Sequence, residues 1–410
     1  MEIQELIKMN NVFIPELGVV KCDTFSAVYP YLNNYLWNQE KFDPSRDGDV
    51  KEMLDVKTHI TNPYRRCVGG YNRNINIFFL LAEAMWIVMG RRDVEFLSIF
   101  NKNMEKYSDD GKVFHAPYGW RMRHWGIRSE DVFTTDGDKG YDQIIAAIKL
   151  LEENPNTRQV VINIWNPNFD LGFKTKDMPC NDILMLKIRD GKLISTIANR
   201  SNDLHLGLPT NIFQFSFLTE LMSAALNVQL GTQTHNSQSL HVYSWNQSAE
   251  IMDIRLQAQR SGKEVVGDMY YQFGAEEMEM DFNFSHEVPG NRFREIEGVI
   301  SLIIENLCRV ANGLEENSDE ISLIQSFSTY LFSSYRLLTI YLKYKAKIAE
   351  PGVDKDFVRS SCMVHITEML NENDEKYDGY CGKRWDIGML ALNFFASRIH
   401  GFKHEYLGSI

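Results

Sequence analysis

The sequence predicts an α+β protein in which a β-sheet packs against helices and an all-helical extension follows at the C-terminus. A hairpin signal supports the sheet, because the strand-like runs DILMLKIR and LISTIANR flank the turn Asp190-Gly191-Lys192. Segments with helical periodicity stand between the strand-like runs as far as about residue 290. From Asn291 onward, Leu, Ile, Phe and Tyr recur at helical spacing. We therefore expect two domains, residues 1–290 with the sheet and residues 291–410 with helices of unknown role.

The expected elements follow the chain in order. An early strand ends over residues 58–61, because the Asn62-Pro63 step interrupts regular structure. Pro155 ends a helix over 140–153, in which Ile144 and Ile148 share one face. The other expected elements are helices over 75–89, 93–107, 210–227 and 246–260, strands over 160–165 and 236–244, and exposed acidic loops over 315–320 and 372–375.

The bulk composition is that of a globular protein with a substantial core, since hydrophobic residues make up 44% and charged residues 24% of the chain. The formal net charge of −12 argues against a nucleic-acid-binding protein, which would show an excess of basic residues. It does not exclude a small anionic ligand, because a few arginines in one pocket are enough to bind one. We expect no nucleic-acid partner.

The sequence also indicates a cytoplasmic protein. The first residues, MEIQELIKMNNVF, lack the basic segment and apolar run of a secretory signal. The longest apolar stretch, Ile75 to Gly90, is interrupted by Asn76 and Glu83 and is too short to span a bilayer. The cysteines at 22, 67, 180, 308, 362 and 381 are scattered and form no CxxC pair. We therefore expect neither a metal site nor a disulfide framework, and no membrane partner.

Cys180 stands at the end of a loop that enters the first strand of the hairpin. A lone buried cysteine is usually inert packing. Arg200 leaves the paired strand twenty residues later, which is one hairpin length, so its guanidinium is expected to return to the thiol. A basic group beside a thiol lowers the pKa of the thiol and makes thiolate available at neutral pH. Taken alone, the Arg200-Ser201 pair would be interpreted as a solvated strand end.

Three other segments carry polar side chains that suit a ligand. Asn211 lies at a helix start, where an amide can meet a planar polar ligand, although an N-terminal cap is the simpler interpretation. His241 and Tyr243 are two residues apart in a strand and therefore share a face. Glu83 stands in the apolar helix LLAEAMWIVMG, where a carboxylate is costly unless it is paired or functional. Burial would raise the pKa of Glu83, which suits acid–base chemistry, while a buried structural glutamate is the alternative.

Together, these segments resemble the thymidylate synthase and deoxycytidylate hydroxymethylase family. The string PC…RDGKL…NRSNDLHLGLPTN…HVY carries the resemblance. It extends back through DQI…NPNTRQVVINIWN, the YGWRMRHWG stretch and the AEAMW helix, and so covers roughly residues 40–290. The resemblance implies a thymidylate synthase-like mixed β-sheet, a pyrimidine nucleotide monophosphate as substrate and 5,10-methylenetetrahydrofolate as the one-carbon donor.

The resemblance implies a catalytic role for five residues. Cys180 matches the nucleophile that adds to C6 of the pyrimidine, and this covalent step divides a difficult alkylation into feasible ones. Arg200 matches a phosphate ligand that also lies near the thiol. Glu83 and Tyr118 match an acid–base carboxylate and a tyrosine that orders the waters of proton transfer. Asp203 matches a carboxylate that bonds near the base and orients its surroundings.

The resemblance also implies how the phosphate is held. Ser201 accompanies Arg200 in the family's phosphate contacts. Arg158 matches an arginine that the partner subunit donates, which implies a homodimer with shared active sites. Arg46, in the run SRDG, matches the mobile phosphate arginine of the family. Bidentate guanidinium contacts suit a phosphate dianion.

The base and the sugar are matched by further residues. Asn211 corresponds to the amide that contacts N3 and O4 of uracil, and Asn199 takes the place of a glutamine in the substrate pocket. His241 and Tyr243 correspond to the pair that contacts the ribose 3′-hydroxyl. These matches complete the expected nucleotide site.

The chain departs from the family at several points. Gln159 replaces a second arginine, Asn181 follows the nucleophile where synthases commonly have histidine, and Asn199 replaces glutamine. The segment 100–115 has no tryptophan where synthases place indoles against the one-carbon intermediate. About 120 residues of helical character follow residue 290, where family enzymes end soon after the strand that holds His241 and Tyr243.

Three functions remain open at this point. Methylation of dUMP to dTMP leads, because Asn211 is the uracil-contacting residue and cytosine-using relatives carry aspartate there. Hydroxymethylation of dUMP, dCMP or CMP is the close alternative, since a methylene without shielding indoles is open to water. An inactive nucleotide sensor with a helical signalling domain is the third, and the retention of Cys180, Glu83 and Tyr118 argues against it.

Overall fold

The computed structural model describes residues 11–68, 75–129, 140–246 and 279–376, together with residues 391, 392, 394–396 and 398. Its centre is an eight-stranded mixed sheet in the order β1-β2-β3-β8-β6-β5-β4, with β7 also paired to β8. The pairs β2–β3, β6–β8 and β7–β8 are parallel and the others are antiparallel. This confirms the predicted α+β fold with a mixed sheet. The strands are β1 (Val12–Ile14), β2 (Val19–Cys22), β3 (Val50–Ile60), β4 (Val160–Asn163), β5 (Asn181–Arg189), β6 (Lys192–Asn199), β7 (Asn202–Asp203) and β8 (Gln229–Tyr243).

The predicted hairpin forms β5 and β6. Asp190 and Gly191 both have positive φ angles, 52° and 70°, which is the geometry of the tight turns that match strand twist. The register pairs Arg189 with Lys192 at the turn and Asn181 with Asn199 at the open end. This open end is where the candidate active site lies, because Cys180 and Arg200 directly continue the paired strands.

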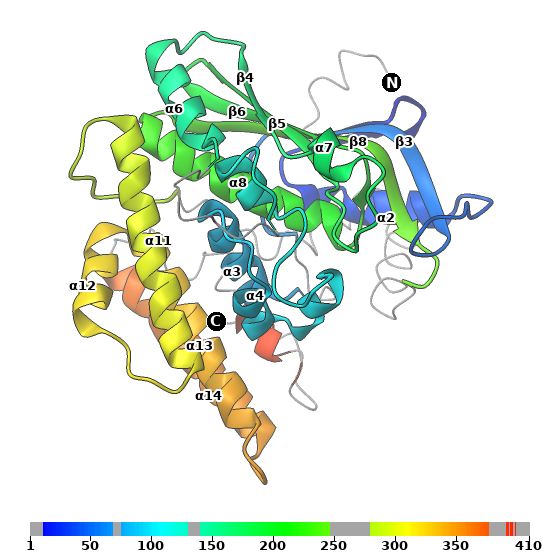
Figure 1. Ribbon diagram of the computed structural model, residues 1–410. Helices are drawn as coiled ribbons and strands as arrows, with labels where there is room; N and C mark the ends of the chain where they lie inside the picture. Colours follow the sequence, from blue (N-terminus) through cyan, green and yellow to red (C-terminus); the bar gives the residue numbers. More distant parts are fainter. Residues whose placement is uncertain are drawn as a thin grey trace.

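The long helix α8 (Gly207–Leu226) lies between the sheet and α3 (Ile77–Val88) (Figure 1). Both helices are apolar around most of their circumference because each is packed on more than one side. This arrangement places Glu83 of α3 toward the interior beneath the sheet. The other helices of this part are α2 (Tyr29–Trp37), α4 (Val94–Phe100), α5 (Tyr118–Arg123), α6 (Gln143–Glu153) and α7 (Pro167–Asp170).

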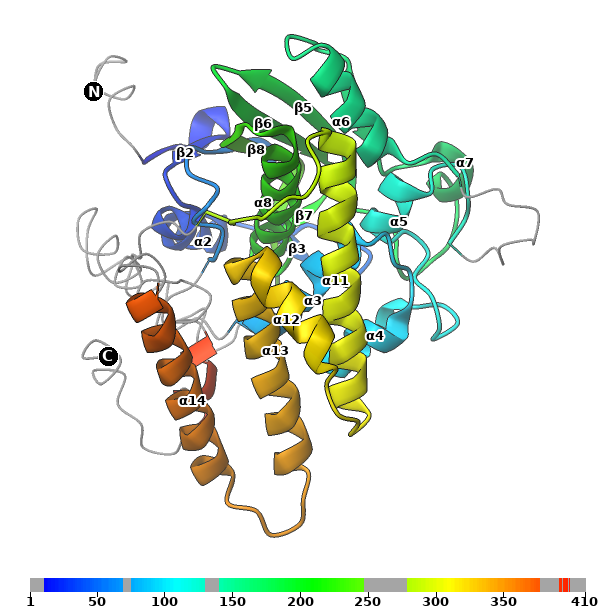
Figure 2. The same ribbon diagram turned by 90° about the vertical axis from the view of Figure 1, so that its left-hand side faces the viewer.

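The C-terminal helices pack against this part of the molecule (Figure 2). They are α11 (Pro289–Ala311), α12 (Ser318–Phe327), α13 (Thr329–Ile348) and α14 (Lys355–Lys376). Helix α11 contacts α6 and α8, and α13 contacts α3. Phe78 of α3 stacks on Tyr341 of α13 with ring centroids 4.4 Å apart. Helix α11 begins next to the boundary expected at residue 290, while its buried side chains join the same hydrophobic cluster as those of α3 and α8. The division into two domains stays a prediction.

Several element bounds differ from the expectation. Strand β8 begins earlier than predicted, at Gln229, while β3, for which only the end over residues 58–61 was expected, runs from Val50 to Ile60. The first acidic run is only partly a loop, since Asn317 caps α12 and the run enters its first turn, where carboxylates favour the helix dipole. The acidic run over 372–375 continues α14 and is not a loop. The helix expected over 246–260 lies outside the described residues. No described helix is long and apolar enough to cross a membrane.

Candidate active site

Cys180 and Arg200 meet as the hairpin register predicts. The Arg200 backbone N–H donates to the Cys180 carbonyl at 3.0 Å, and its Nη2 lies 3.8 Å from the Cys180 Sγ. The Nε of Arg200 donates to the Pro179 carbonyl at 2.8 Å, which holds the guanidinium against the loop that carries the cysteine. The guanidinium also lies over the Trp165 ring, 5.7 Å from its centroid. The positive charge is therefore fixed beside the thiol.

The ionisation of the thiol differs from the sequence-based prediction. Burial raises the pKa of Cys180 above its usual value, while the charges of Arg200 and Arg46 lower it. The expected arginine is present and acts in the expected direction. The prediction of a lowered pKa is nonetheless wrong for the free protein, because burial destabilises the thiolate by more than the two arginines stabilise it.

A chain of buried amides runs beside the cysteine. Asn199 Nδ2 donates to Asn181 Oδ1, and Asn181 Nδ2 donates to Asn211 Oδ1 at 3.1 Å. Asn211 Nδ2 donates to Asn202 Oδ1 at 3.3 Å, and Asn202 Nδ2 donates to Ser237 Oγ at 3.1 Å. Beyond these bonds, Asn211 still has one amide hydrogen to donate and one carbonyl lone pair to accept. A donor beside an acceptor can pair with an edge of a pyrimidine that presents one acceptor and one donor.

His241 and Tyr243 share one face of β8, as predicted, with ring centroids 4.9 Å apart. Asp203 pairs with His241 across the β7–β8 register and accepts backbone hydrogen bonds from His205 and Leu206. Burial lowers the pKa of His241, so the ring is neutral at neutral pH. Burial raises the pKa of Tyr243 to about 12, so its hydroxyl stays protonated. Both side chains can therefore hydrogen-bond a sugar hydroxyl without adding charge.

Arg46 lies on an exposed turn and pairs with Asp47, its Nη2 at 2.9 Å from the carboxylate. The charge of Arg46 acts on both Cys180 and Tyr243, which indicates that the turn lies close to these two residues. Ser201 follows Arg200 and is half-buried. These residues gather positive charge and a hydroxyl at one end of the candidate site, an arrangement that suits an anionic group.

Arg158 is the exception among the predicted residues. It is exposed and lies two residues before β4, whose first residue, Val160, pairs with Leu186 near the middle of β5. Cys180 stands beyond the other end of β5, so the strand rise puts Arg158 on the order of 25 Å away. The chain thus assembles the other predicted residues and leaves Arg158 outside its own site.

Glu83 and Tyr118 line a cavity of about 130 Å³ next to the cysteine. Burial raises the pKa of Glu83 to about 8, and its Oε2 has no hydrogen-bond partner among the described residues. Burial also raises the pKa of Tyr118. Its hydroxyl lies within hydrogen-bonding reach of the Cys180 backbone and the Asn181 side chain. A protonated carboxyl and a neutral phenol thus stand at the inner end of the site. The lining residues are Glu83, Trp86, Ile87, Leu97, Met104, Tyr107, Phe114, Ala116, Pro117, Tyr118 and Asp177.

Comparison with known proteins agrees with this geometry. The family model described as thymidylate synthase matches residues 71–280, about half of the chain. The chain belongs to the thymidylate synthase family. Cys180, Arg200, Asn211 and the 241–243 pair all lie within the matched residues, whereas helices α11 to α14 lie beyond them.

The similar members of the family include phage enzymes that modify deoxyuridylate. A deoxyuridylate hydroxymethyltransferase of Bacillus phage SP01 is 43% identical over 210 residues, which are 51% of this chain and 54% of that protein. A second one, of Pseudomonas phage M6, is 35% identical over 215 residues, 51% of this chain and 58% of that protein. Thymidylate synthase 1/2 of Encephalitozoon cuniculi is 38% identical over 126 residues, 31% of this chain and 42% of that protein. The match thus spans about half the length of these curated relatives.

Asp177 is a residue of the candidate site that sequence reasoning missed. It stands three residues before Cys180 and lines the cavity with Glu83 and Tyr118. The only signal in the sequence was a carboxylate in the loop that leads to the nucleophile, and loop carboxylates are usually solvated. Asp177 is half-buried in the cavity wall instead, and burial raises its pKa to about 6.

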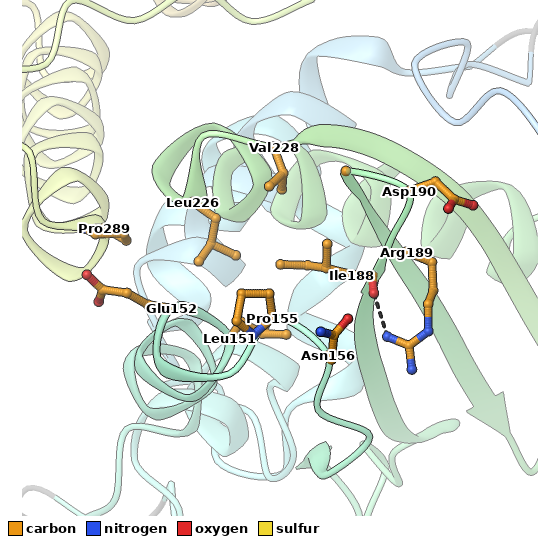
Figure 3. Close-up of a pocket in the computed structure, with 11 residues that line it drawn as sticks. Leu151, Glu152, Pro155, Asn156, Ile188, Arg189, Asp190, Leu226, Val228 and Pro289 are labelled. Atoms are coloured by element: carbon orange, nitrogen blue, oxygen red, sulfur yellow. Dashed lines mark hydrogen bonds between the residues drawn. The ribbon is translucent and has the colours of Figure 1, made fainter.

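A second cavity, of about 560 Å³, lies at the far end of the hairpin (Figure 3). It is bounded by the hairpin turn, the end of α8 and the start of α11, and apolar side chains such as Ile188, Leu226 and Val228 line it. It stands at the opposite end of β5 from Cys180, and none of the predicted thymidylate synthase site residues lines it. This cavity is separate from the candidate active site.

Proposed function

We propose that this protein transfers a one-carbon unit from 5,10-methylenetetrahydrofolate to C5 of dUMP and that water completes the reaction, giving 5-hydroxymethyl-dUMP. The observation that carries the proposal is the lining of the cavity beside Glu83. The segment 100–115 contributes Met104, Tyr107 and Phe114 there and no tryptophan. Tyr107 is 51% exposed, so this segment places no indole between the cavity and water, and Trp86 of the lining is buried in the cavity wall. The similarity to phage deoxyuridylate hydroxymethyltransferases supports the same choice.

Cys180 begins the proposed reaction by adding to C6 of the pyrimidine. Addition needs the thiolate, and the thiol of the free protein is largely protonated because burial raises its pKa. Arg200, 3.8 Å from the sulfur, stabilises the thiolate once it forms. The addition places negative charge at C5 and on O4, which makes C5 a nucleophile toward the one-carbon unit.

The cavity lined by Glu83 and Tyr118 would hold the folate ring system. Its aromatic and aliphatic walls, which include Trp86 and Phe114, suit a flat ring system, and its carboxylates suit the polar edge of a pterin. The bound donor supplies the methylene group. With a pKa of about 8, Glu83 is protonated at neutral pH and can deliver or take up a proton through water.

The nucleotide would lie across the other groups of the site. Arg46, Arg200 and Ser201 would bind the phosphate, with His241 and Tyr243 at the 3′-hydroxyl. Asp203 pairs with His241 in the register of β7 and β8, and its carboxylate acts electrostatically on the His241 ring. Asn211 would contact O4 and N3–H of uracil, supported by Asn181 and Asn199 through the amide chain.

A homodimer would complete the phosphate site with Arg158 of the other subunit. The exposed position of Arg158, far from its own cysteine, supports this. A second support is the sheet face opposite α8, on which Ile183, Met185 and Ile194 are half-buried and Val161 is 45% exposed. Burying such apolar side chains against a second copy is favourable at about 25 cal/mol per Å².

Product identification tests the proposal. Purified protein is incubated with dUMP and methylenetetrahydrofolate, and the nucleotide products are separated and weighed by mass spectrometry. We expect 5-hydroxymethyl-dUMP together with tetrahydrofolate, and no product from Cys180→Ala. Formation of dTMP with dihydrofolate would replace this proposal by the synthase reaction, since only that reaction takes its hydride from the folate.

A further inference from the structure

Asp177 is held firmly at the inner end of the candidate site. Its Oδ2 accepts the Ala116 N–H at 2.8 Å, and Ala116 stands two residues before Tyr118. The Asp177 N–H donates to Thr175 Oγ1 at 3.1 Å, and Thr175 is anchored in turn to Asp109 at 2.6 Å. The Ala116 backbone N–H thus holds the carboxylate, and the Thr175 hydroxyl holds the backbone of Asp177.

Asp177 lines the cavity, and only one of its two carboxylate oxygens accepts a hydrogen bond from the described residues. Oδ1 has no hydrogen-bond partner in the described part of the chain, and the side chain keeps a partly accessible surface although protein surrounds it. Asp177 also acts electrostatically on three groups of the site, Glu83, Tyr118 and Cys180. An oxygen in this position can accept a hydrogen bond from a water molecule in the cavity.

Asp177 and Glu83 differ in ionisation at neutral pH. Burial and the charge of Asp109 raise the pKa of Asp177, to about 6. The hydrogen bond from the Ala116 N–H and the charges of His115 and Arg121 lower it. The pKa of Glu83 is about 8. At pH 7 Asp177 therefore accepts protons and Glu83 donates them. Two carboxyls with separated pKa values in one cavity are the usual arrangement for a base and an acid.

We propose that Asp177 is the general base that takes a proton from the water added to the one-carbon unit at C5. This rests on the proposed function above. After tetrahydrofolate leaves, C5 of the Cys180-bound nucleotide carries an exocyclic methylene conjugated to C4=O. The water oxygen bonds to the methylene carbon, the proton passes to Asp177, and the electron pair of the C=C bond moves to O4. The enolate then re-forms C5=C6 and expels the Cys180 thiolate, so no oxidant or reductant is needed.

The test separates formation of the methylene from its capture by water. Tritium release from [5-³H]dUMP reports one-carbon transfer to C5, and 5-hydroxymethyl-dUMP reports capture by water. Asp177→Asn should keep tritium release within a few-fold and lower 5-hydroxymethyl-dUMP roughly 100-fold, the usual contribution of a general base. Added 2-mercaptoethanol should then collect the methylene as a thioether of dUMP.

Asp182→Asn is the matched control. Asp182 is also half-buried near the cysteine with a pKa raised to about 6, but it does not line the cavity. This variant should leave the ratio of hydroxymethyl product to tritium release unchanged. In wild type the ratio should fall below about pH 6 as Asp177 is protonated, and it should not vary with pH in Asp177→Asn. Covalent labelling by 5-fluoro-dUMP confirms that each variant is folded.

The outcomes are distinguishable. If wild type makes 5-hydroxymethyl-dUMP and Asp177→Asn lowers it only in proportion to tritium release, with no thioether, the role of Asp177 is refuted and the proposed function stands. If wild type makes dTMP, the proposed function fails and the role of Asp177 fails with it.

Discussion

Glu83 is a buried carboxyl whose removal should change stability in a way that identifies its charge state. Its pKa in the folded protein is about 8, whereas an unfolded chain has a pKa near 4.3. Between these values the folded protein binds more protons than the unfolded chain. The free energy of unfolding therefore decreases as the pH rises through this window. The contribution of Glu83 is fully present below about pH 4 and is lost as the pH approaches 8.

The size of this effect follows from the two pKa values. Integrating the difference in bound protons from pH 5 to pH 8 gives a loss of about 3.5 kcal/mol. Glu83→Gln cannot ionise, so it lacks this loss while keeping an amide that can contact Gln214. The free energy of unfolding of the variant relative to that of wild type should therefore increase by about 3.5 kcal/mol when the pH is raised from 5 to 8.

Urea unfolding at pH 5, 6, 7 and 8 measures the difference, with Glu153→Gln as the control because that carboxylate is exposed at the end of α6. The control should follow wild type at every pH. If Glu83→Gln also follows wild type, Glu83 does not titrate in this window and cannot serve as the proton donor. The same variant should release tritium from [5-³H]dUMP more slowly by at least 100-fold.

Three further predictions concern the nucleotide. Asn211→Asp should shift the ratio of kcat/KM for dUMP and dCMP toward dCMP by about five- to 150-fold, because a mispaired buried contact costs about 1–3 kcal/mol; a wild type that prefers dCMP would contradict the uracil contact. Mixing Cys180→Ala with Arg158→Ala should restore about a quarter of wild-type activity, since half of the dimers would have one intact site; no recovery after verified subunit exchange would refute the shared site. Arg200→Met should slow labelling by 5-fluoro-dUMP roughly tenfold at pH 7 and less at pH 9, because the thiol pKa rises; equal slowing at both values would assign Arg200 to binding alone.

Local chemistry made part of the structure predictable. The Asp190-Gly191 turn requires positive φ angles, and its register alone brings Cys180 beside Arg200. Helix α3 was recognisable because it is apolar apart from Glu83. The start of β8 was predicted too late and the start of β3 was not predicted, because polar residues such as Lys51 and Gln229 open these strands and no apolar alternation marks them.

The properties that depend on burial were not accessible from the sequence. The pKa of Cys180 is raised because protein surrounds the thiol, and no spacing in the chain reports that surrounding. Asp177 was missed for the same reason, since its interior position follows from the contact with Ala116 and not from its loop. The cavity between the hairpin turn and Pro289 depends on how α11 docks, which the helical periodicity of α11 leaves open.

The covalent role of Cys180 is the central claim, and trapping the adduct tests it most directly. Protein is incubated with 5-fluoro-dUMP and methylenetetrahydrofolate, and the complex is digested and sequenced by mass spectrometry. Fluorine at C5 cannot leave as a cation, so the covalent complex should accumulate. We predict the nucleotide and the folate on the peptide that contains Cys180, and no adduct in Cys180→Ala. An adduct on another cysteine, or turnover of dUMP by the alanine variant, would contradict the account.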